Sequence, residues 1–529
     1  AAVSGASAPV SAEGTTTMRF RSVDNAGNTS AWTTVAAGST VNLDRTAPSL
    51  PVVSGGSVSW SSAASATITG SGSSDALSGV AGYQYETALN GGAWSAPVSG
   101  SSVPISAEGT TTVQFRSVDN AGNTSSWTTV GSGSTVKLDR TAPTAATASG
   151  GSLSWQNVAS VLVTGSGETD AGSGIAGYEF RTSTDGGTTW SAPATGTSTT
   201  VSAEGQTLVE FRATDNAGNV GAWAPSPATA GSTVQLDRAA PTPPTVSGGS
   251  LTWTNAASTT ISATGSTDTG SGLAGYQSRT STNGGSTWSA WSATGPGSLA
   301  VPGTGQTLVQ FRSVDVAGNV SAAMPATNGA ANTVLQDRTA PSVPTASGGS
   351  SSWLTSASST VTAAGGSDTG GSGFAAYQYE TSFNGGAWSA PVTGPSAPIT
   401  AEGTTTVQFR SVDNAGNTSA WSVVGSGSTV KLDRTAPSLP TVTGGSLTCV
   451  SSRIRIRASG STDSGSGFLR YQYHYSTNGG AFGSTTSGTT ASFSSKGTYV
   501  VQFQAVDRAG NVSAWAPAVA GAANTACHS

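Results

Sequence analysis

Charge is what this sequence has least of. Charged residues make up only 9% of the 529 residues, against about 25% in an ordinary soluble domain. The net charge is −5, and lysine occurs only at Lys137, Lys431 and Lys496. No strongly basic face can form from so few cations, so nucleic acid and anionic membranes are not expected as partners.

Long apolar segments and histidines are scarce as well. No run approaches the roughly 18 apolar residues of a membrane-spanning helix, so a membrane-spanning protein is not expected, and no signal peptide is visible. The only histidines are His474 and His528. Most of the chain therefore has no Ser/His/Asp or Cys/His set, and no glycine loop joins a strand to a helix to hold phosphate. We expect no enzyme and no organic cofactor.

The abundant glycine does not indicate disorder. Glycine contributes 71 residues, but 14 Trp, 10 Tyr and 12 Phe are also present. Disordered segments are poor in aromatic residues. The Gly and Ser residues also separate short β-branched runs, as turn residues do between strands.

A ten-residue phrase, first seen as VDNAGNTSAW at residues 23–32, organises the whole chain. Its aspartate recurs every 94 to 100 residues, at Asp24, Asp119, Asp215, Asp315, Asp413 and Asp507. That period is too long for a single solenoid repeat and suits an entire β-sandwich of about 100 residues. A second phrase, LDRTAP or a close variant, marks the boundaries between units.

We therefore predict one half-unit and five full units. The half-unit is residues 1–47. The full units are named repeat 1 to repeat 5 and span 48–142, 143–240, 241–340, 341–436 and 437–529.

Repeat 2 shows the strands of one unit. Residues 177–184 (GYEFRTST) alternate up to a DGG turn, and TTWSAP returns from it, which predicts a β-hairpin. Residues 208–215 (LVEFRATD) place Val209, Phe211 and Ala213 on one face of a strand. No helical periodicity occurs, so each unit is expected to be all-β, with two sheets packed face to face.

These phrases resemble the bacterial Ig-like and fibronectin-III-like repeats of large secreted surface proteins. The resemblance rests on FRSVDNAGNTSAW, the Y…NGG.W hairpin and the LDRTAP boundary, and it covers nearly the whole chain. It implies a tandem array of Ig-like β-sandwiches forming an elongated rod, in an extracellular structural or adhesive setting. It implies no particular ligand, because a scaffold does not fix a function.

The DNAGN phrase has a local explanation as a turn. Asp119 and Asn120 can bond to their own backbone, and Gly122 can take a positive φ. Asn123 can cap the exit, and Trp127 is expected to fold over one end of the core. The alternative is a metal site.

Acidic residues recur at three places in each unit, which raises the question of calcium. Candidate ligands for an ion that prefers six to eight oxygens are Asp75, Asp119, Asp139, Asp170, Asp215 and Asp237. Each of the five boundary aspartates is followed directly by arginine. An Asp–Arg pair or an Asx turn is therefore favoured over a calcium ion at the boundary.

The two cysteines lie in repeat 5. Cys449 takes the place of a tryptophan that recurs in the other repeats, and Cys527 falls in the last strand. A disulfide between them would close a loop of about 78 residues and would indicate an oxidising compartment. Two buried free thiols are the alternative.

The half-unit matches only the second half of a repeat. Half a sandwich exposes its core and unpaired strand edges, so it is not expected to be stable alone. Either the chain continues upstream or a neighbouring subunit supplies the missing strands, which would let the protein self-associate into filaments.

Two functions from different classes remain open. The leading one is an extracellular structural protein that forms a bacterial surface filament or stalk. The alternative is an adhesin that binds glycans, or a host or cell surface, through exposed tryptophans. The tryptophans after the hairpin turn are its candidate ligands: Trp94, Trp190, Trp288, Trp291 and Trp388.

Overall fold

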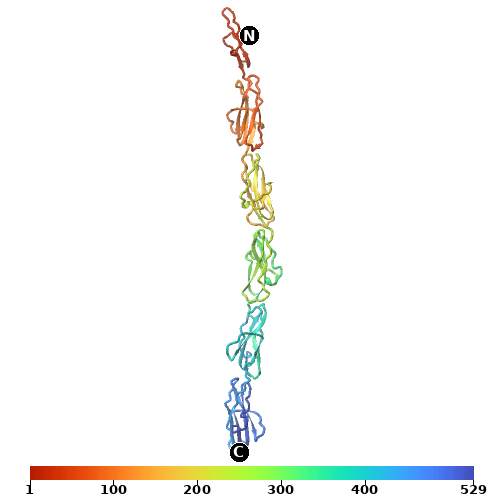
Figure 1. Cartoon of the computed structure of the whole chain (residues 1–529), viewed down its shortest axis with the longest axis vertical. Helices are drawn as coiled ribbons and strands as arrows, with labels where there is room; N and C mark the ends of the chain where they lie inside the picture. Colours follow the sequence, from red (N-terminus) through yellow and green to blue (C-terminus); the bar gives the residue numbers. More distant parts are fainter. The chain divides into compact units, whose positions relative to one another are not determined.

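The computed structural model describes all 529 residues, and its regular structure consists of β-strands and five short 3₁₀ helices (Figure 1). No helix in it has the length and apolar character needed to cross a membrane. Contacts divide the chain into two compact parts. The first part holds residues 1–240 with the loops 268–272 and 315–319, and the second part holds residues 241–267, 273–314 and 320–529.

The strands follow the same order in every repeat. The half-unit has β1 Gly14–Thr17, η1 Ala37–Ser39 and β2 Thr40–Leu43. Repeat 1 has β3 Val52–Ser54, β4 Trp60–Ser61, β5 Ala66–Ser71, β6 Val80–Leu89, β7 Val98–Ser99, β8 Ser102–Ile105, β9 Gly109–Asp119, η2 Ser132–Ser134 and β10 Thr135–Leu138. Repeat 2 has β11 Thr147–Ser149, β12 Val161–Ser166, β13 Ile175–Ser183, β14 Ala194–Thr195, β15 Ser198–Val201, β16 Gly205–Asp215, η3 Ala230–Ser232 and β17 Thr233–Leu236. Repeat 3 has β18 Thr245–Ser247, β19 Ser258–Thr264, β20 Leu273–Ser281, β21 Ser298–Pro302, β22 Gly305–Asp315, η4 Ala330–Asn332 and β23 Thr333–Gln336.

The last two repeats continue the pattern. Repeat 4 has β24 Thr345–Ser347, β25 Trp353–Leu354, β26 Ser359–Ala364, β27 Phe374–Phe383, β28 Val392–Thr393, β29 Ser396–Ile399, β30 Gly403–Asp413, η5 Ser426–Ser428 and β31 Thr429–Leu432. Repeat 5 has β32 Thr441–Thr443, β33 Ser446–Val450, β34 Ile454–Ser459, β35 Phe468–Thr477, β36 Thr486–Ser487, β37 Thr490–Phe493, β38 Gly497–Asp507 and β39 Thr525–His528.

Two sheets make up each repeat, as repeat 1 illustrates. A three-stranded sheet has the order β3-β5-β8, and a five-stranded sheet has the order β4-β10-β9-β6-β7. The core between them contains Ile68 and Val103 from the first sheet and Val113, Phe115 and Leu138 from the second. Alternation along β9 places Val113 and Phe115 inward, because successive side chains of a strand point to opposite faces. The all-β prediction is confirmed.

The hairpin after the long strand is built by Asn-Gly. Asn90 and Gly91 have φ values of 50° and 71°, and the Gly92 N–H donates to the Leu89 carbonyl. Two consecutive positive φ angles with this bond define the tight turn that matches strand twist. Repeat 2 differs, since Asp185 instead accepts from the Thr189 N–H and hydroxyl in a longer loop.

The half-unit has two strands and no core of its own. Strands β1 and β2 pair antiparallel through Gly14–Leu43 to Thr17–Thr40. Phe20 occupies the place that Phe115 has in repeat 1, yet Phe20 is 42% exposed and Phe115 is fully buried. The strands that cover this ring in a full repeat are the ones residues 1–47 do not contain.

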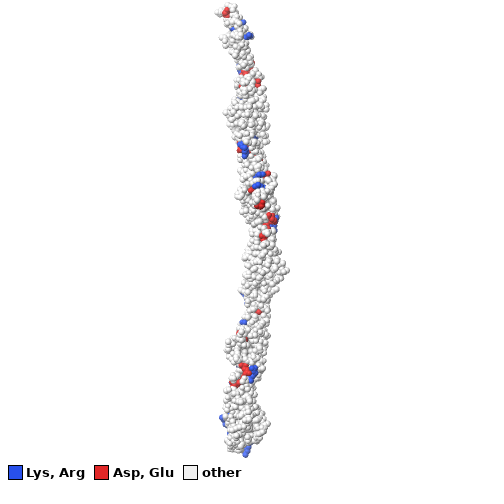
Figure 2. All heavy atoms as spheres, in the orientation of Figure 1, with Lys and Arg blue, Asp and Glu red and all other residues white.

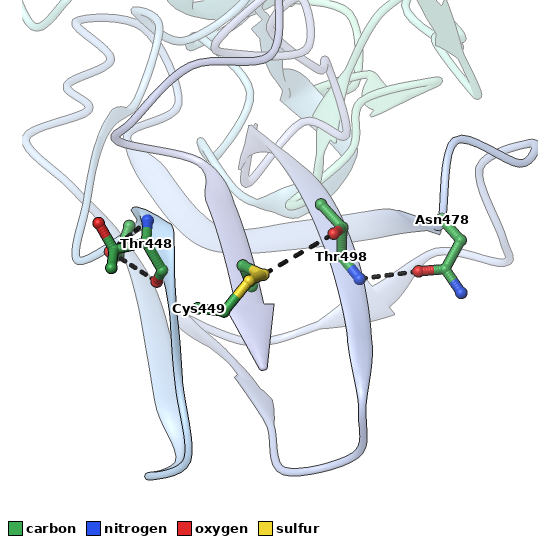
Figure 3. Close-up of a disulfide and its surroundings, with 6 residues drawn as sticks. Thr448, Cys449, Asn478 and Thr498 are labelled. Carbon is green, nitrogen blue, oxygen red and sulfur yellow. Dashed lines mark hydrogen bonds between the residues drawn. A yellow bond between two sulfur atoms is a disulfide. The ribbon is translucent and has the colours of Figure 1, made fainter. Parts of the chain in front are cut away.

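Repeat 5 contains the disulfide between Cys449 and Cys527, as predicted (Figure 3). Cys449 lies in β33, which pairs parallel with β39, and Cys527 lies in β39. In repeat 1 the corresponding parallel pair is Trp60 opposite Lys137, with the ammonium over the ring. The covalent link therefore replaces a cation–π contact at the same place in the sandwich.

Candidate functional site

The DNAGN phrase forms a turn held by its aspartate. Asp119 Oδ1 accepts from the Ala121 and Asn123 N–H groups, and Asp119 Oδ2 accepts from Asn123 Nδ2. Gly122 has a φ of 91°. The predicted roles of Asp119, Gly122 and Asn123 are therefore found. Asn120 was expected to bond to its own turn, but its amide donates to the Ser78 and Gly79 carbonyls of the loop before β6.

The same turn also bonds to the boundary segment that precedes repeat 1. Asn123 Nδ2 donates to the Asp44 carbonyl, and Asp44 Oδ2 accepts from the Ser78 N–H. Asp75 accepts from the Gly79 N–H in the loop before β6. Three segments that are far apart in the sequence thus meet: the boundary, the loop before β6 and the turn after β9.

This arrangement places three carboxylates together at five places, called here the Asp triads. One carboxylate oxygen from each member lies within 4.8 Å of the others in every triad. The triads are Asp44–Asp75–Asp119, Asp139–Asp170–Asp215, Asp237–Asp268–Asp315, Asp337–Asp368–Asp413 and Asp433–Asp463–Asp507. All six predicted metal-ligand candidates lie in the first three triads.

The triads are partly buried. Asp337, Asp433 and Asp507 are fully buried, whereas the loop aspartate of each triad is half-buried. Burial acts to raise the pKa of Asp139, but hydrogen bonds from Ser173 and Thr141 outweigh it, and the pKa lies below its ordinary value. The pKa values of Asp119, Asp237 and Asp337 are lowered by the same balance of causes. Each site thus brings three carboxyl groups together in a partly buried place.

The predicted ion pair between the boundary aspartate and the next arginine is wrong. Arg140 pairs with Glu108 instead, at 3.2 Å, and its guanidinium also donates to the Ala64 and Ser106 carbonyls. Arg238 and Arg434 pair with glutamates in the same way. The Asx-turn alternative is found, since Asp139 Oδ1 accepts from the Thr141 N–H. All five salt bridges of the structure use glutamate, so no Lys or Arg neutralises a triad.

The triads have the donors and the dimensions of a calcium site. Calcium takes oxygens at 2.3–2.6 Å, so ligands on opposite sides of one ion lie about 5 Å apart, close to the span of a triad. In the fourth triad the Ser372 N–H donates to Asp337 Oδ2. The Ser372 side chain is also buried, and its hydroxyl oxygen has no hydrogen-bond partner. A buried hydroxyl without a partner beside a carboxylate cluster is an additional oxygen that a cation could take.

Glycine allows the loop before β13 to approach the boundary carboxylate. A Cβ at Gly172 would lie 2.4 Å from Asp139 Oδ2, and a Cβ at Gly465 would lie 2.5 Å from Asp433. Repeat 5 differs at one position, where Arg508 stands in place of Asn120. Its guanidinium donates to the Ser466 carbonyl and forms no ion pair with the triad. Sequence patterns gave no signal for the role of Gly172, because a close approach depends on the fold.

The tryptophan candidates for glycan binding have two different environments. Trp190 and Trp288 are half-buried, and each lies against an arginine, Arg181 at 4.5 Å and Arg279 at 5.0 Å from the ring centroid. Trp94 and Trp388 are 39% and 40% exposed and contact no cation. Trp127 does not cover the end of the core as expected, since its ring lies over Arg116 on the outer face of the sheet.

Charge is sparse on the molecular face shown in Figure 2, where red and blue atoms gather in small groups. Buried carboxylates contribute little to such a surface. The low overall charge therefore does not prevent a high local charge inside each triad.

Comparison with known proteins supports this architecture. The family model described as bacterial Ig-like domain matches residues 1–37 and 29–132. Exoglucanase B of Cellulomonas fimi is 37% identical over 211 residues, which are 38% of this chain and 19% of that protein. The chain thus spans about a fifth of that relative's length.

Among solved structures, the FN1–FN3 domains of chicken CNTN1 match with 15% identity and a TM-score of 0.19, covering 54% of this chain and 99% of theirs. The family match covers residues 1–132, and the repeated all-β sheets of the remaining chain are consistent with a tandem array of Ig-like β-sandwich domains.

The tight fit at Gly172 leads to a prediction. Replacing Gly172 with Ala should destabilise repeat 2 by about 1–3 kcal/mol, because the new methyl group must displace the Asp139 carboxylate. Gly177→Ala is the matched control, since a Cβ there has nothing within 4 Å. Chemical denaturation of both variants measures the effect, and equal stabilities would contradict the predicted contact.

Proposed function

We propose that this chain is a non-enzymatic, extracellular structural protein of a bacterial surface filament or stalk. We further propose that each Asp triad binds one calcium ion. The observation that carries the proposal is the fivefold recurrence of a partly buried, uncompensated triad where a boundary meets two loops of the following repeat. Catalytic residues would occur once in a chain, whereas architectural residues recur with its period.

A bound calcium ion would reduce the repulsion among the three carboxylates of each triad. Three ionised carboxylates in a partly buried site repel one another strongly, and a divalent cation removes most of that repulsion. The residues that would hold the ion in repeat 2 are Asp139, Asp170 and Asp215. The bound ion would then fix the boundary segment against both loops and limit motion at that point.

Two further features support an extracellular setting. A disulfide persists in oxidising compartments and is rare in the cytosol. Extracellular calcium modules bind with dissociation constants of about 10⁻⁴–10⁻³ M, which suits a site of only three carboxylates. The bacterial Ig-like match is consistent with such a setting.

Calcium should stabilise the chain against heat. At a free concentration ten times the dissociation constant, ligand binding adds about 1.4 kcal/mol to the stability of the unit that binds it. Calorimetric scans in millimolar calcium should therefore show a higher melting temperature than scans in EGTA. The double variant Asp139→Asn, Asp215→Asn should lose this gain in repeat 2.

The control for this experiment is Asp185→Asn. Asp185 holds a hairpin loop outside the triads, and repeat 3 has Asn283 at the same place. The control should respond to calcium as the unchanged chain does. Identical melting in calcium and EGTA, or equal losses in the control and the triad variant, would contradict calcium binding by the triads.

Assembly through the half-unit forms the second part of the proposal. Phe20 and Val41 are 42% and 36% exposed, whereas their equivalents Phe115 and Val136 lie in the core of repeat 1. Strands outside residues 1–47 would cover these side chains, either from upstream in the same protein or from a neighbouring chain by β-strand addition. We propose the neighbouring chain, because a filament subunit needs a contact of this kind.

Sedimentation velocity tests the assembly. The chain should associate as its concentration rises, and Phe20→Asp should abolish the association by placing a charge in the covered face. Val3→Asp is the control, because Val3 is 84% exposed and lies outside the strands. A chain that stays monomeric at every concentration, or a Phe20→Asp variant that still associates, would contradict this part.

A further inference from the structure

The outer face of the larger sheet in repeat 2 has a stack of alternating aromatic rings and guanidinium groups. The Arg181 guanidinium lies 4.5 Å from Trp190 and 4.6 Å from Trp223, and Arg212 lies 4.2 Å from Trp223. We call the place of Arg181, between the hairpin tryptophan and the next ring, the stacking position.

Repeats 3 and 5 fill the stacking position with a side chain of their own. In repeat 3, Arg279 lies 5.0 Å from Trp288 and 4.5 Å from Trp291. In repeat 5, the His474 ring is stacked between Phe482 and Trp515, with centroids 4.2 and 3.6 Å away. In repeats 2, 3 and 5, three different combinations of side chains thus place a nitrogen-bearing group between two aromatic rings.

Repeats 1 and 4 have a glutamate at this place. Glu86 and Glu380 correspond to Arg181 in the strand before the hairpin turn. Oε1 of Glu86 accepts from Gln114 Nε2 at 2.8 Å, and Oε1 of Glu380 accepts from Gln408 Nε2 at 2.8 Å. In both residues Oε2 accepts no hydrogen bond, although Glu86 is only 8% exposed.

The hairpin tryptophans of these two repeats have the register of the filled repeats. The Ser95 N–H donates to the Thr87 carbonyl, just as the Ser191 N–H donates to the Thr182 carbonyl. The backbone at Trp94 therefore has the register of Trp190, and Glu86 has the sequence position of Arg181. The ring of Trp94 is left 39% exposed, with no cation against it.

We propose that the stacking positions of repeats 1 and 4 bind an arginine side chain of a partner polypeptide. The guanidinium would stack on Trp94 or Trp388 and donate to the free Oε2 of Glu86 or Glu380. Repeats 2 and 3 satisfy the same position internally, so they would not bind the partner.

Charge complementarity favours arginine over other occupants. A carboxylate that keeps an unpaired oxygen in a nearly buried place is stabilised by a cationic donor. Arginine also stacks on aromatic faces and can donate in a fixed planar geometry, as Arg181 does on this same sheet. A neutral sugar could stack on Trp94 but would leave the charge of Glu86 without a counter-ion.

The test uses the full chain with ¹⁵N-labelled tryptophan indoles, and N-acetyl-argininamide as the probe. The indole signals of Trp94 and Trp388 should shift at millimolar probe concentrations, while those of Trp190 and Trp288 should not. N-acetyl-citrullinamide is the neutral control of the same shape and should cause no shift. Signals are assigned by single Trp→Phe substitutions.

Variants separate the proposed contact from a general effect on the fold. Glu86→Gln with Glu380→Gln should weaken binding roughly tenfold, the range expected when one charge-assisted hydrogen bond is lost. Glu86→Arg with Glu380→Arg should abolish binding by filling the position from within. Arg279→Glu should create binding in repeat 3, because it restores a glutamate beside Gln310, the partner of Arg279.

Three results would overturn the proposal. The first is an equal shift with the citrulline probe, and the second is unchanged binding in the Glu→Gln variant. The third is a shift of Trp94 and Trp388 by cellobiose but not by the arginine probe, which would assign the surface to glycans. Thermal unfolding of each variant shows whether the fold is retained. The calcium proposal is independent, so the titration is run in calcium and in EGTA.

Discussion

Three carboxyl groups lie within 4.8 Å of one another at each unit boundary, and the local structure depends on how they are balanced. Each triad combines an aspartate of the boundary, one of a loop and one of the DNAGN turn. Hydrogen bonds from Ser173 and Thr141 hold the pKa of Asp139 below its ordinary value. The neighbouring Arg140 does not pair with the triad, because it pairs with Glu108. We propose that a divalent cation balances the carboxylates, since its oxygen preference matches the donors present.

The sequence predicted best the features that depend on neighbouring residues or on the comparison of one repeat with another. The DGG motif of repeat 2 predicted a hairpin, because positive φ angles are needed there and few residues accept them. The equivalent Asn90-Gly91 forms the tight turn, whereas Asp185 lies in a longer loop. The DNAGN turn followed from the same reasoning, and Cys449 and Cys527 were paired by their places in the repeat. The alternation of Val209, Phe211 and Ala213 predicted the buried face of β16. Each of these inferences needs only near neighbours or the comparison of one unit with another.

Predictions were wrong for side chains whose contacts come from residues far away in the sequence. Arg140 was expected to pair with the preceding Asp139, but the fold brings Glu108 within 3.2 Å. Trp127 was expected over the core, but its ring lies on Arg116. Alternation fixes the face of a strand residue but not the direction of a loop residue, so neither outcome followed from the pattern. Trp190 and Trp288 each lie against an arginine, whereas repeat 1 has Glu86 at the position of that arginine. This position is more than 5 residues away in sequence from the tryptophan.

Calcium binding by the triads is the central claim, and counting bound ions tests it most directly. Native mass spectrometry of the intact chain in millimolar calcium should show five bound calcium ions, and the Asp139→Asn, Asp215→Asn chain should show four. A chain that binds no calcium, or a double variant that binds as many ions as the intact chain, would contradict the account. The triads would then be hydrogen-bonded turns that tolerate their own charge.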